Sequence, residues 1–181
     1  ATEDDSNGTV TVVTSGAENG QTVTLTLNAQ DYTGSVSSDS TSITVPANDL
    51  QSLTDGTTYD MSANVSDAAG NAATQFTTSA GNGQFTVDKS APTAAITYSP
   101  EGPYKQSDSV TITATFNEDI LDSPIMQIAI AGSGIAGLTA TNMTKSSSTV
   151  YTYNYSVPTG DGTGTITIST GTDLAGNEIT A

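Results

Sequence analysis

The chain has no cysteine, histidine, arginine or tryptophan among its 181 residues. Without cysteine it can form no disulfide, carry out no thiol chemistry and bind no zinc through thiolates. Without histidine it lacks the usual general base near neutral pH and the commonest ligand of transition metals. Without arginine it lacks the side chain that binds phosphate and carboxylate groups through two parallel hydrogen bonds. These absences exclude most catalytic sites and most transition-metal sites.

Positive charge is also scarce. Lys89, Lys105 and Lys145 are the basic residues, against nineteen carboxylates, and the net charge is −16. Such a charge argues against binding to nucleic acid or to an anionic membrane surface, and it favours cations as ligands. No apolar stretch approaches the roughly 18 residues of a membrane span, so no membrane insertion is expected.

The chain begins at Ala1 and shows no signal peptide, so we interpret it as a processed or excised piece of a longer protein. Serine, threonine, glycine, alanine and asparagine dominate its sequence. Few side chains are charged apart from the acids. This composition is typical of secreted proteins, and it predicts an extracellular location at the cell surface.

Apolar and polar residues alternate along most of the chain. In the run 22–27, for example, Val23, Leu25 and Leu27 fall on one face and threonines on the other. Half-buried antiparallel strands give this pattern, because successive side chains point to opposite faces. Strands are predicted near 9–14, 22–28, 32–37, 41–45, 57–66, 73–87, 93–99, 109–117, 125–131, 135–142, 149–157 and 164–170. One short helix is predicted at 46–53, where a proline opens the run.

A five-residue turn occurs twice, each time after an alternating run. The copies are Asp-Ala-Ala-Gly-Asn at 67–71 and Asp-Leu-Ala-Gly-Asn at 173–177. The duplication indicates two related modules in tandem, and Pro92 places their boundary at the end of a strand pattern. The sequence therefore predicts an all-β chain of two antiparallel β-sandwich domains, residues 1–88 and 89–181.

The two predicted domains align loop by loop. The segment 16–20 is matched with 100–103, the Asp-Gly turn at 55–56 with the one at 161–162, and the two five-residue turns with each other. Ample chain for a final strand follows the first five-residue turn. Four residues follow the second, so the second domain is expected to lack its last strand or to borrow one from a neighbour.

Three segments resemble bacterial immunoglobulin-like repeats: Asp-Gly-Thr-Thr-Tyr at 55–59, the turn at 67–71, and the linker Phe-Thr-Val-Asp-Lys-Ser-Ala-Pro-Thr at 85–93. Such repeats form the extender regions of large surface adhesins, including the RTX type, and related repeats occur in surface-layer proteins. The run 102–118 resembles a second variety of the same superfamily. The resemblance implies Greek-key immunoglobulin-like sandwiches joined end to end, with neighbouring repeats of the same chain as partners and a role in cell adhesion and biofilms.

Immunoglobulin-like topology gathers alternate loops at opposite ends of a domain, and it sorts the acidic residues into two predicted clusters. The cluster expected at the junction between the domains comprises Asp88, Asp173, Glu118, Asp119, Asp122, Glu18, Asp55 and the backbone carbonyl of Asn177. The cluster expected at the N-terminal end of the first domain comprises Asp4 or Asp5, Asp31, Asp67 and the backbone carbonyl of Asn71. Both clusters offer oxygen ligands alone.

Calcium is the predicted ligand of these clusters, since it takes roughly six to eight oxygens from carboxylates, carbonyls and water. The absence of histidine and cysteine excludes most zinc and copper sites. The resemblance to extender repeats also implies joints that calcium makes rigid. A plainer interpretation stays open, because Asp-Gly and Gly-Asn are strong turn signals without any metal.

The leading functional hypothesis is a non-catalytic extender, or stalk, of a large extracellular adhesin, made rigid by calcium at the junction. One alternative is a module whose loops or sheet face bind a glycan or a surface protein. Another is a filament or surface-layer subunit that exchanges strands with its neighbours. No enzymatic activity is expected, because the chain has no phosphate-binding loop, no Ser-His-Asp set and no metal-hydrolase motif.

Overall fold

The computed structural model describes residues 6–79 and 83–179, which are all-β apart from one short helix. Neighbouring strands of its sheets pair antiparallel throughout. The chain divides into two compact units, Thr2–Asp88 and Lys89–Ala181, called here the N-terminal unit and the C-terminal unit. No helix in the described ranges is long and apolar enough to cross a membrane.

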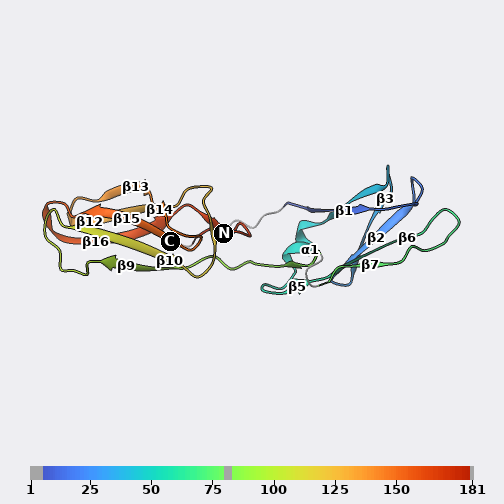
Figure 1. Ribbon diagram of the computed structural model, residues 1–181, viewed down its shortest axis with the longest axis horizontal. Helices are drawn as coiled ribbons and strands as arrows, with labels where there is room; N and C mark the ends of the chain where they lie inside the picture. The colour runs from blue at the N-terminus through green and yellow to red at the C-terminus, as the bar shows by residue number, and fades with distance from the viewer. Residues whose placement is uncertain (1–5, 80–82, 180–181) are drawn as a thin grey trace. The chain divides into compact units, whose positions relative to one another are not determined.

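The N-terminal unit is built from short strands and the helix α1 (Figure 1). Its strands are β1 (Gly8–Val13), β2 (Thr22–Leu27), β3 (Gln30–Ser35), β4 (Ser40–Val45), β5 (Thr58–Tyr59), β6 (Met61–Val65), β7 (Phe76–Thr77) and β8 (Phe85–Thr86). The helix α1 (Ala47–Gln51) lies between β4 and β5 in the chain. The largest sheet has the order β3-β2-β6-β7, and β1 pairs with β4 and β5 with β8.

The C-terminal unit has longer strands in two main sheets. Its strands are β9 (Ala94–Ser99), β10 (Ser109–Phe116), β11 (Ile120–Leu121), β12 (Gln127–Ile135), β13 (Leu138–Asn142), β14 (Thr144–Lys145), β15 (Val150–Ser156), β16 (Gly160–Ser169) and β17 (Thr172–Asp173). One sheet has the order β14-β15-β10-β9 and the other β13-β12-β16, while β11 pairs with β17.

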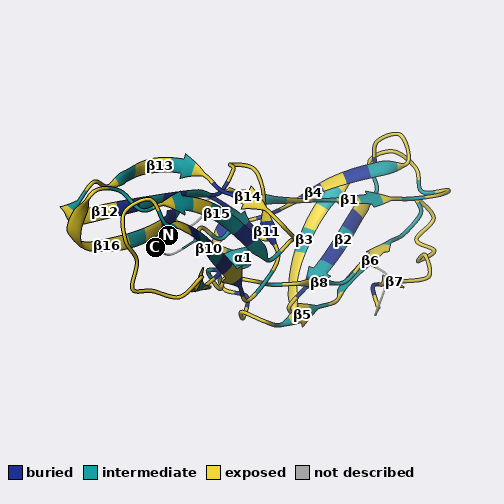
Figure 2. Cartoon of the chain, turned by 60° about the vertical axis from the view of Figure 1, so that its left-hand side comes forward, coloured by how far each residue is buried: buried dark blue, intermediate teal, exposed yellow. Residues whose placement is uncertain are grey.

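Alternation along the strands produces one buried face and one exposed or half-exposed face, as Figure 2 shows by colour. On β2, Val23, Leu25 and Leu27 are buried, and the threonines between them face outward. On β10, Val110 and Ile112 are buried in the same way. Each unit has a separate core made from these buried faces. Burial of the apolar face therefore sets which side of each strand faces inward.

Most predicted strands are present, with ends that differ by a few residues. The prediction of one continuous strand at 73–87 is wrong: the run first pairs β7 with β6 and later pairs β8 with β5. Gly83 lies between the two pieces at a φ of 78°, a left-handed conformation that interrupts a strand. The predicted end of a strand at 131 is also wrong, because β12 continues to Ile135 alongside β16.

The pairing partners align the two units differently from the sequence prediction. β1 pairs with β4 as β10 pairs with β15, and β2 pairs with β3 and β6 as β12 pairs with β13 and β16. A counterpart of β9 is not found within 6–79 and 83–88. The loop at 14–21 therefore corresponds to the loop at 117–126, and its predicted match with 100–103 is wrong. Alternation identifies a strand but not its partner.

Replacing Ile128 by alanine tests the core of the C-terminal unit. Ile128 is fully buried, so we expect the unit to lose about 2–5 kcal/mol of unfolding free energy, through lost burial and the cavity left behind. Chemical denaturation measures the loss. Ile125→Ala is the matched control, since that side chain is 47% exposed and should cost clearly less. Equal losses from the two substitutions would contradict the assigned core.

Candidate metal centre

The two five-residue turns have the same internal hydrogen bonds. In the first, the Asn71 backbone N–H donates to Asp67 Oδ1 over 2.8 Å and the Asn71 side-chain amide to Asp67 Oδ2 over 2.8 Å. In the second, Asn177 makes the same bonds to Asp173 over 2.8 and 2.7 Å. The Asp67 N–H donates to the Asn71 carbonyl, and the Asp173 N–H to the Asn177 carbonyl. The repeated sequence therefore builds a repeated structure.

The hydrogen bonds of the first turn stabilise its carboxylate in the charged form. The Asn71 side-chain amide is the largest cause that lowers the pKa of Asp67, and the Asn71 backbone N–H is the next. The N–H of Ala69 also donates to this carboxylate, over 3.0 Å. Ionised Asp67 is thus part of the turn itself, which agrees with the plain structural interpretation of the motif.

In the C-terminal unit, the loop that carries Glu118 is tied to the segment that leads into the unit. The Thr93 N–H donates to Asn117 Oδ1 over 2.7 Å, and the Asn117 N–H donates to the Thr93 carbonyl over 3.2 Å. The Asn117 side-chain amide donates to Glu118 Oε1 over 3.2 Å. Asn117 therefore links Glu118 to Thr93, in the segment that leads into the C-terminal unit.

The second turn lies at this same end of the unit. Ile120 pairs with Asp173 between β11 and β17, which joins the Glu118 loop to the turn. Asp173 is 1% exposed, so its carboxylate is held in place inside the protein. A buried carboxylate is costly unless hydrogen bonds or a cation satisfy it, and Asn177 supplies two of those bonds.

Asp88, Glu118 and Asp173 each offer a carboxylate oxygen, and these oxygens all lie within 4.8 Å of one another. Asp88 directly precedes Lys89, the first residue of the C-terminal unit. Glu118 is half-buried and Asp173 buried. Three carboxylates at this spacing repel one another, and an oxygen-only donor set fits a hard cation such as calcium. We call these three residues the acidic cluster.

The other residues of the predicted junction set lie outside this group of three. Asp119 adjoins Glu118 and Asp122 follows in the same loop, but neither is among the oxygens that lie within 4.8 Å. The Gly56 N–H donates to the Val87 carbonyl over 2.8 Å, so the turn that contains Asp55 lies against the residue before Asp88. The Asn177 carbonyl accepts the Asp173 N–H over 3.1 Å. Their roles as ligands stay predictions.

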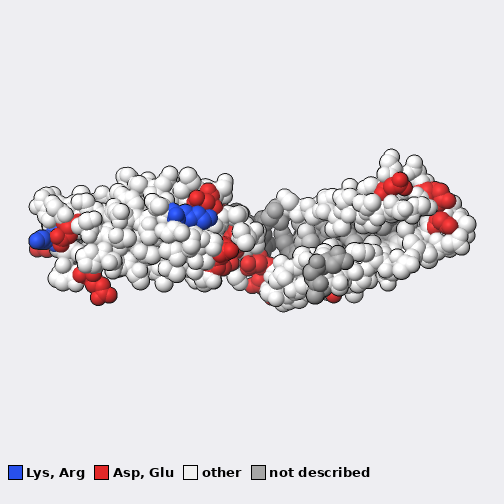
Figure 3. Space-filling view, viewed as in Figure 1, with Lys and Arg blue, Asp and Glu red and all other residues white. Residues whose placement is uncertain are grey.

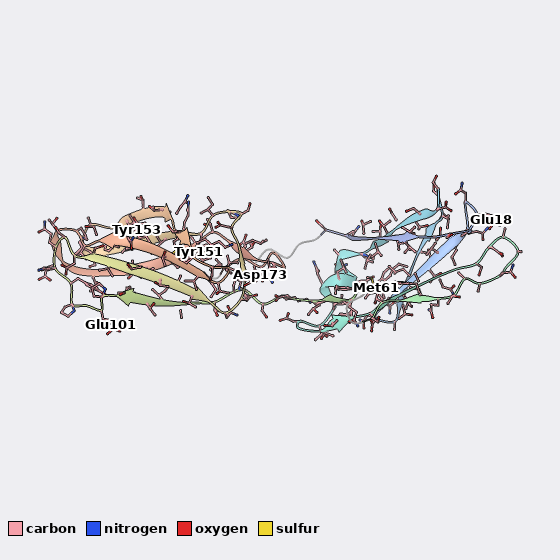
Figure 4. The ribbon with its side chains drawn as sticks, in the orientation of Figure 1. Glu18, Met61, Glu101, Tyr151, Tyr153 and Asp173 are labelled. Atoms are coloured by element: carbon pink, nitrogen blue, oxygen red, sulfur yellow. The ribbon has the colours of Figure 1, made fainter. Side chains whose placement is uncertain are left out.

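The placement predicted for Glu18 is wrong. We expected its loop at the end of the N-terminal unit opposite the 67–71 turn, but Glu18 Oε2 accepts the Ala68 N–H over 2.9 Å. Figure 4 shows Glu18 at one end of this unit and Met61, the first residue of β6, nearer its middle. Because 14–21 corresponds to 117–126, Glu18 occupies the loop that in the C-terminal unit carries Glu118.

The predicted grouping of Asp31 with Asp67 is also wrong. Asp31 pairs with Thr26 in the β2–β3 register and accepts its hydroxyl over 2.6 Å, at the end of β2 that pairs with the start of β6. The 67–71 turn follows the other end of β6, so the two acids lie at opposite ends. Asp4 and Asp5 lie outside the described residues.

Sequence reasoning did not identify Asn117 or the contact between Glu18 and the first turn. An asparagine directly before Glu118 was a visible signal, but its role depends on Thr93, which is remote in sequence. On the face that Figure 3 shows, most carboxylates lie near the ends of the units.

No family model and no curated protein matches the chain. Among solved structures, it is similar to a 1.5-MDa bacterial ice-binding adhesin from a study of its host cell surface retention, with a TM-score of 0.54 and 18% sequence identity. The match covers 98% of this chain and 55% of that chain, so this chain spans about half the length of its neighbour. At this identity the likeness shows an adhesin-like all-β fold.

Replacing Asn71 by alanine tests the charged turn. Asn71 is the main cause of the lowered pKa of Asp67, so the variant should raise that pKa toward its ordinary value. A lowered folded pKa gives stability that is present above the unfolded pKa and is lost as pH falls through the folded one. The variant's deficit should therefore shrink in acid. Carboxyl NMR titration measures the pKa, with Asn142→Ala as control; an unchanged Asp67 titration would refute the assignment.

Proposed function

We propose that the chain is a non-catalytic extender segment of a large extracellular adhesin, built from immunoglobulin-like sandwiches and stiffened by calcium. The acidic cluster of Asp88, Glu118 and Asp173 is the observation that carries the proposal. Two of its members come from loops of the C-terminal unit, and the third is the residue that precedes that unit. The similarity in fold to part of a large adhesin supports the same function.

Calcium bound at the cluster would supply positive charge that offsets the repulsion among three carboxylates. Glu118 would be held by the amide of Asn117, and Asp173 by the amide and N–H of Asn177. Two ligands are thus positioned by their own unit before the ion binds. Asp88 is exposed, and its carboxylate would complete the set of three ligands. The ion would thereby restrain the linker rather than reshape the unit.

A restrained linker is what an extender needs, because freely rotating joints would let a chain of repeats collapse into a coil. The strong negative charge keeps an exposed protein soluble and disfavours contacts with nucleic acid and anionic membranes. The partners under this proposal are neighbouring repeats of the same chain, and the location is the cell surface.

Calcium titration of the full chain tests the acidic cluster. We expect calcium to raise the melting temperature, because a ligand that binds the folded state stabilises it by about 2.7 kcal/mol at a hundred times its Kd. The double variant Asp88→Asn, Glu118→Gln should weaken calcium binding about tenfold or more, since two charged ligands are lost. Isothermal titration calorimetry measures the affinity.

Glu101→Gln is the matched control for that titration, because it also removes an exposed carboxylate. Glu101 lies between β9 and β10 at the end of the unit opposite Asp173, as the labels in Figure 4 show. The control should bind calcium like the wild type. Equal calcium affinity in wild type, double variant and control would mean that the cluster is not the site.

Solution scattering with and without calcium tests the proposed stiffening. Saturating calcium should narrow the distribution of interatomic distances, and EDTA should broaden it, because no ion then links Asp88 to Glu118 and Asp173. The double variant should show the broad distribution in both conditions. Calcium binding without any change in scattering would keep the metal site and reject the stiffening role.

A further inference from the structure

The loop that carries Glu118 is anchored at Ile120, two residues further along the chain. Ile120 pairs with Asp173 between β11 and β17, and its side chain is 2% exposed. Its backbone N–H donates to the Ser148 carbonyl over 2.9 Å. Its carbonyl accepts a hydrogen bond from Lys145 Nζ over 3.1 Å. Ile120 therefore connects both the Glu118 loop and Asp173 to the hairpin that β14 and β15 form.

The ammonium group of Lys145 is held over an aromatic ring as well. Lys145 lies directly opposite Tyr151 in the β14–β15 pair, and Nζ is 5.8 Å from the centroid of that ring. This distance is within the range of cation–π attraction. Tyr151 is fully buried and meets Phe116 edge to face, with ring centroids 6.0 Å apart. The core fixes the ring, so the ammonium has two contacts that fix its position.

The partner of this ammonium is unusual for so acidic a chain. The chain has nineteen carboxylates, yet Lys145 donates to a backbone carbonyl and not, within the described residues, to a carboxylate. An ammonium paired with a carboxylate of the acidic cluster would compete with a cation for that ligand. Bonded to the Ile120 carbonyl, Lys145 holds the loop and leaves the carboxylate oxygens of the acidic cluster to a cation.

In the N-terminal unit, a neutral group makes the corresponding link. The loop that carries Glu18 corresponds to the loop that carries Glu118. Asn19 Oδ1 accepts the N–H of Ser38, in the turn between β3 and β4, over 2.9 Å. In both units the acidic loop is thus hydrogen-bonded to the segment that precedes β4 or β15. The two links share a hydrogen bond but not a charge.

We propose that Lys145 is a positioning residue of the acidic cluster, an inference that rests on the proposed calcium site. Its ammonium fixes the Ile120 carbonyl and so holds the Glu118 loop beside Asp173. Calcium then meets two of its ligands already in place, because outer partners of a metal site orient the ligands. Lys145 acts through Ile120 and not as a ligand, since an ammonium has no lone pair to offer a metal.

A positioning role and a plain charge effect predict opposite results when the ammonium is removed. An ammonium close to the acidic cluster repels a calcium ion, so the loss of its charge alone should strengthen calcium binding. The loss of a positioning hydrogen bond should weaken it. Lys145→Met separates the two effects, because methionine keeps an unbranched apolar side chain over Tyr151 but has no ammonium.

Isothermal titration of the full chain with calcium tests the proposal. Lys145→Met should weaken calcium binding about tenfold, as loss of an outer partner does at other metal sites. Lys145→Arg should restore most of the affinity, since a guanidinium also donates to a carbonyl. Lys105→Met is the matched control: it removes the same charge from the loop between β9 and β10 and should bind like the wild type. Wild-type or tighter binding by Lys145→Met would overturn the proposal, even where its melting temperature falls.

Amide exchange of the calcium-free chain gives a second readout. The Ile120 N–H donates to the Ser148 carbonyl, so it should lose protection in Lys145→Met and keep it in Lys145→Arg. Unchanged protection in Lys145→Met would overturn the proposal. Absence of calcium binding by the wild type would reject the proposed function together with the role of the lysine. Wild-type affinity in Lys145→Met, with weakened binding in the double variant Asp88→Asn, Glu118→Gln, would reject the role of the lysine alone.

Discussion

In each unit, hydrogen bonds between an aspartate and the asparagine four residues later fix the geometry of the turn that carries the carboxylate. In both copies of the turn, the asparagine donates to both carboxylate oxygens and its carbonyl accepts the N–H of the aspartate. The bonds fix the direction of the carboxylate and the point at which the chain turns back. Gly70 and Gly176 complete the turns at φ values of 89° and 96°, which suit glycine. The five-residue turn thus positions the aspartate carboxylate and directs the chain into the segment that follows.

The same turn has different acidic neighbours in the two units, and these neighbours set how many carboxylates gather around its aspartate. Around Asp67 the neighbouring loop contributes Glu18, which accepts a backbone N–H of the turn. Around Asp173 it contributes Glu118, and the residue leading into the unit adds Asp88. An aspartate with hydrogen-bond donors alone needs no ion. Three carboxylates within 4.8 Å of one another repel, and a cation would offset that repulsion. The proposed metal site therefore depends on the cluster and not on the turn motif alone.

Sequence reasoning identified what is local and failed where the outcome depends on partners. Period-two alternation located most of the strands, because every second residue of a half-buried strand is apolar and faces the core. It also located the Asp173 turn and the acids beside it, since turn residues and loop acids are visible one at a time. It placed Glu18 and Asp31 at the wrong ends, because alternation does not say that β1 pairs with β4. It could not reveal that Asn117 links Glu118 to Thr93, since that bond joins segments far apart in sequence.

The two units differ at the place where the end of the run 75–87 packs in the N-terminal unit. In the N-terminal unit, the strands after the turn bring Phe85 and Val87 into the core, whereas the C-terminal unit has a groove at that place. The inward positions of β16 facing the groove include Gly164, which adds no apolar surface of its own. The glycines of β16 pack against β12: a Cβ added to Gly162 would meet the Ser133 carbonyl oxygen, and one added to Gly164 would meet the Ile130 side chain. Close approach of the paired strand therefore accounts for glycine at these positions.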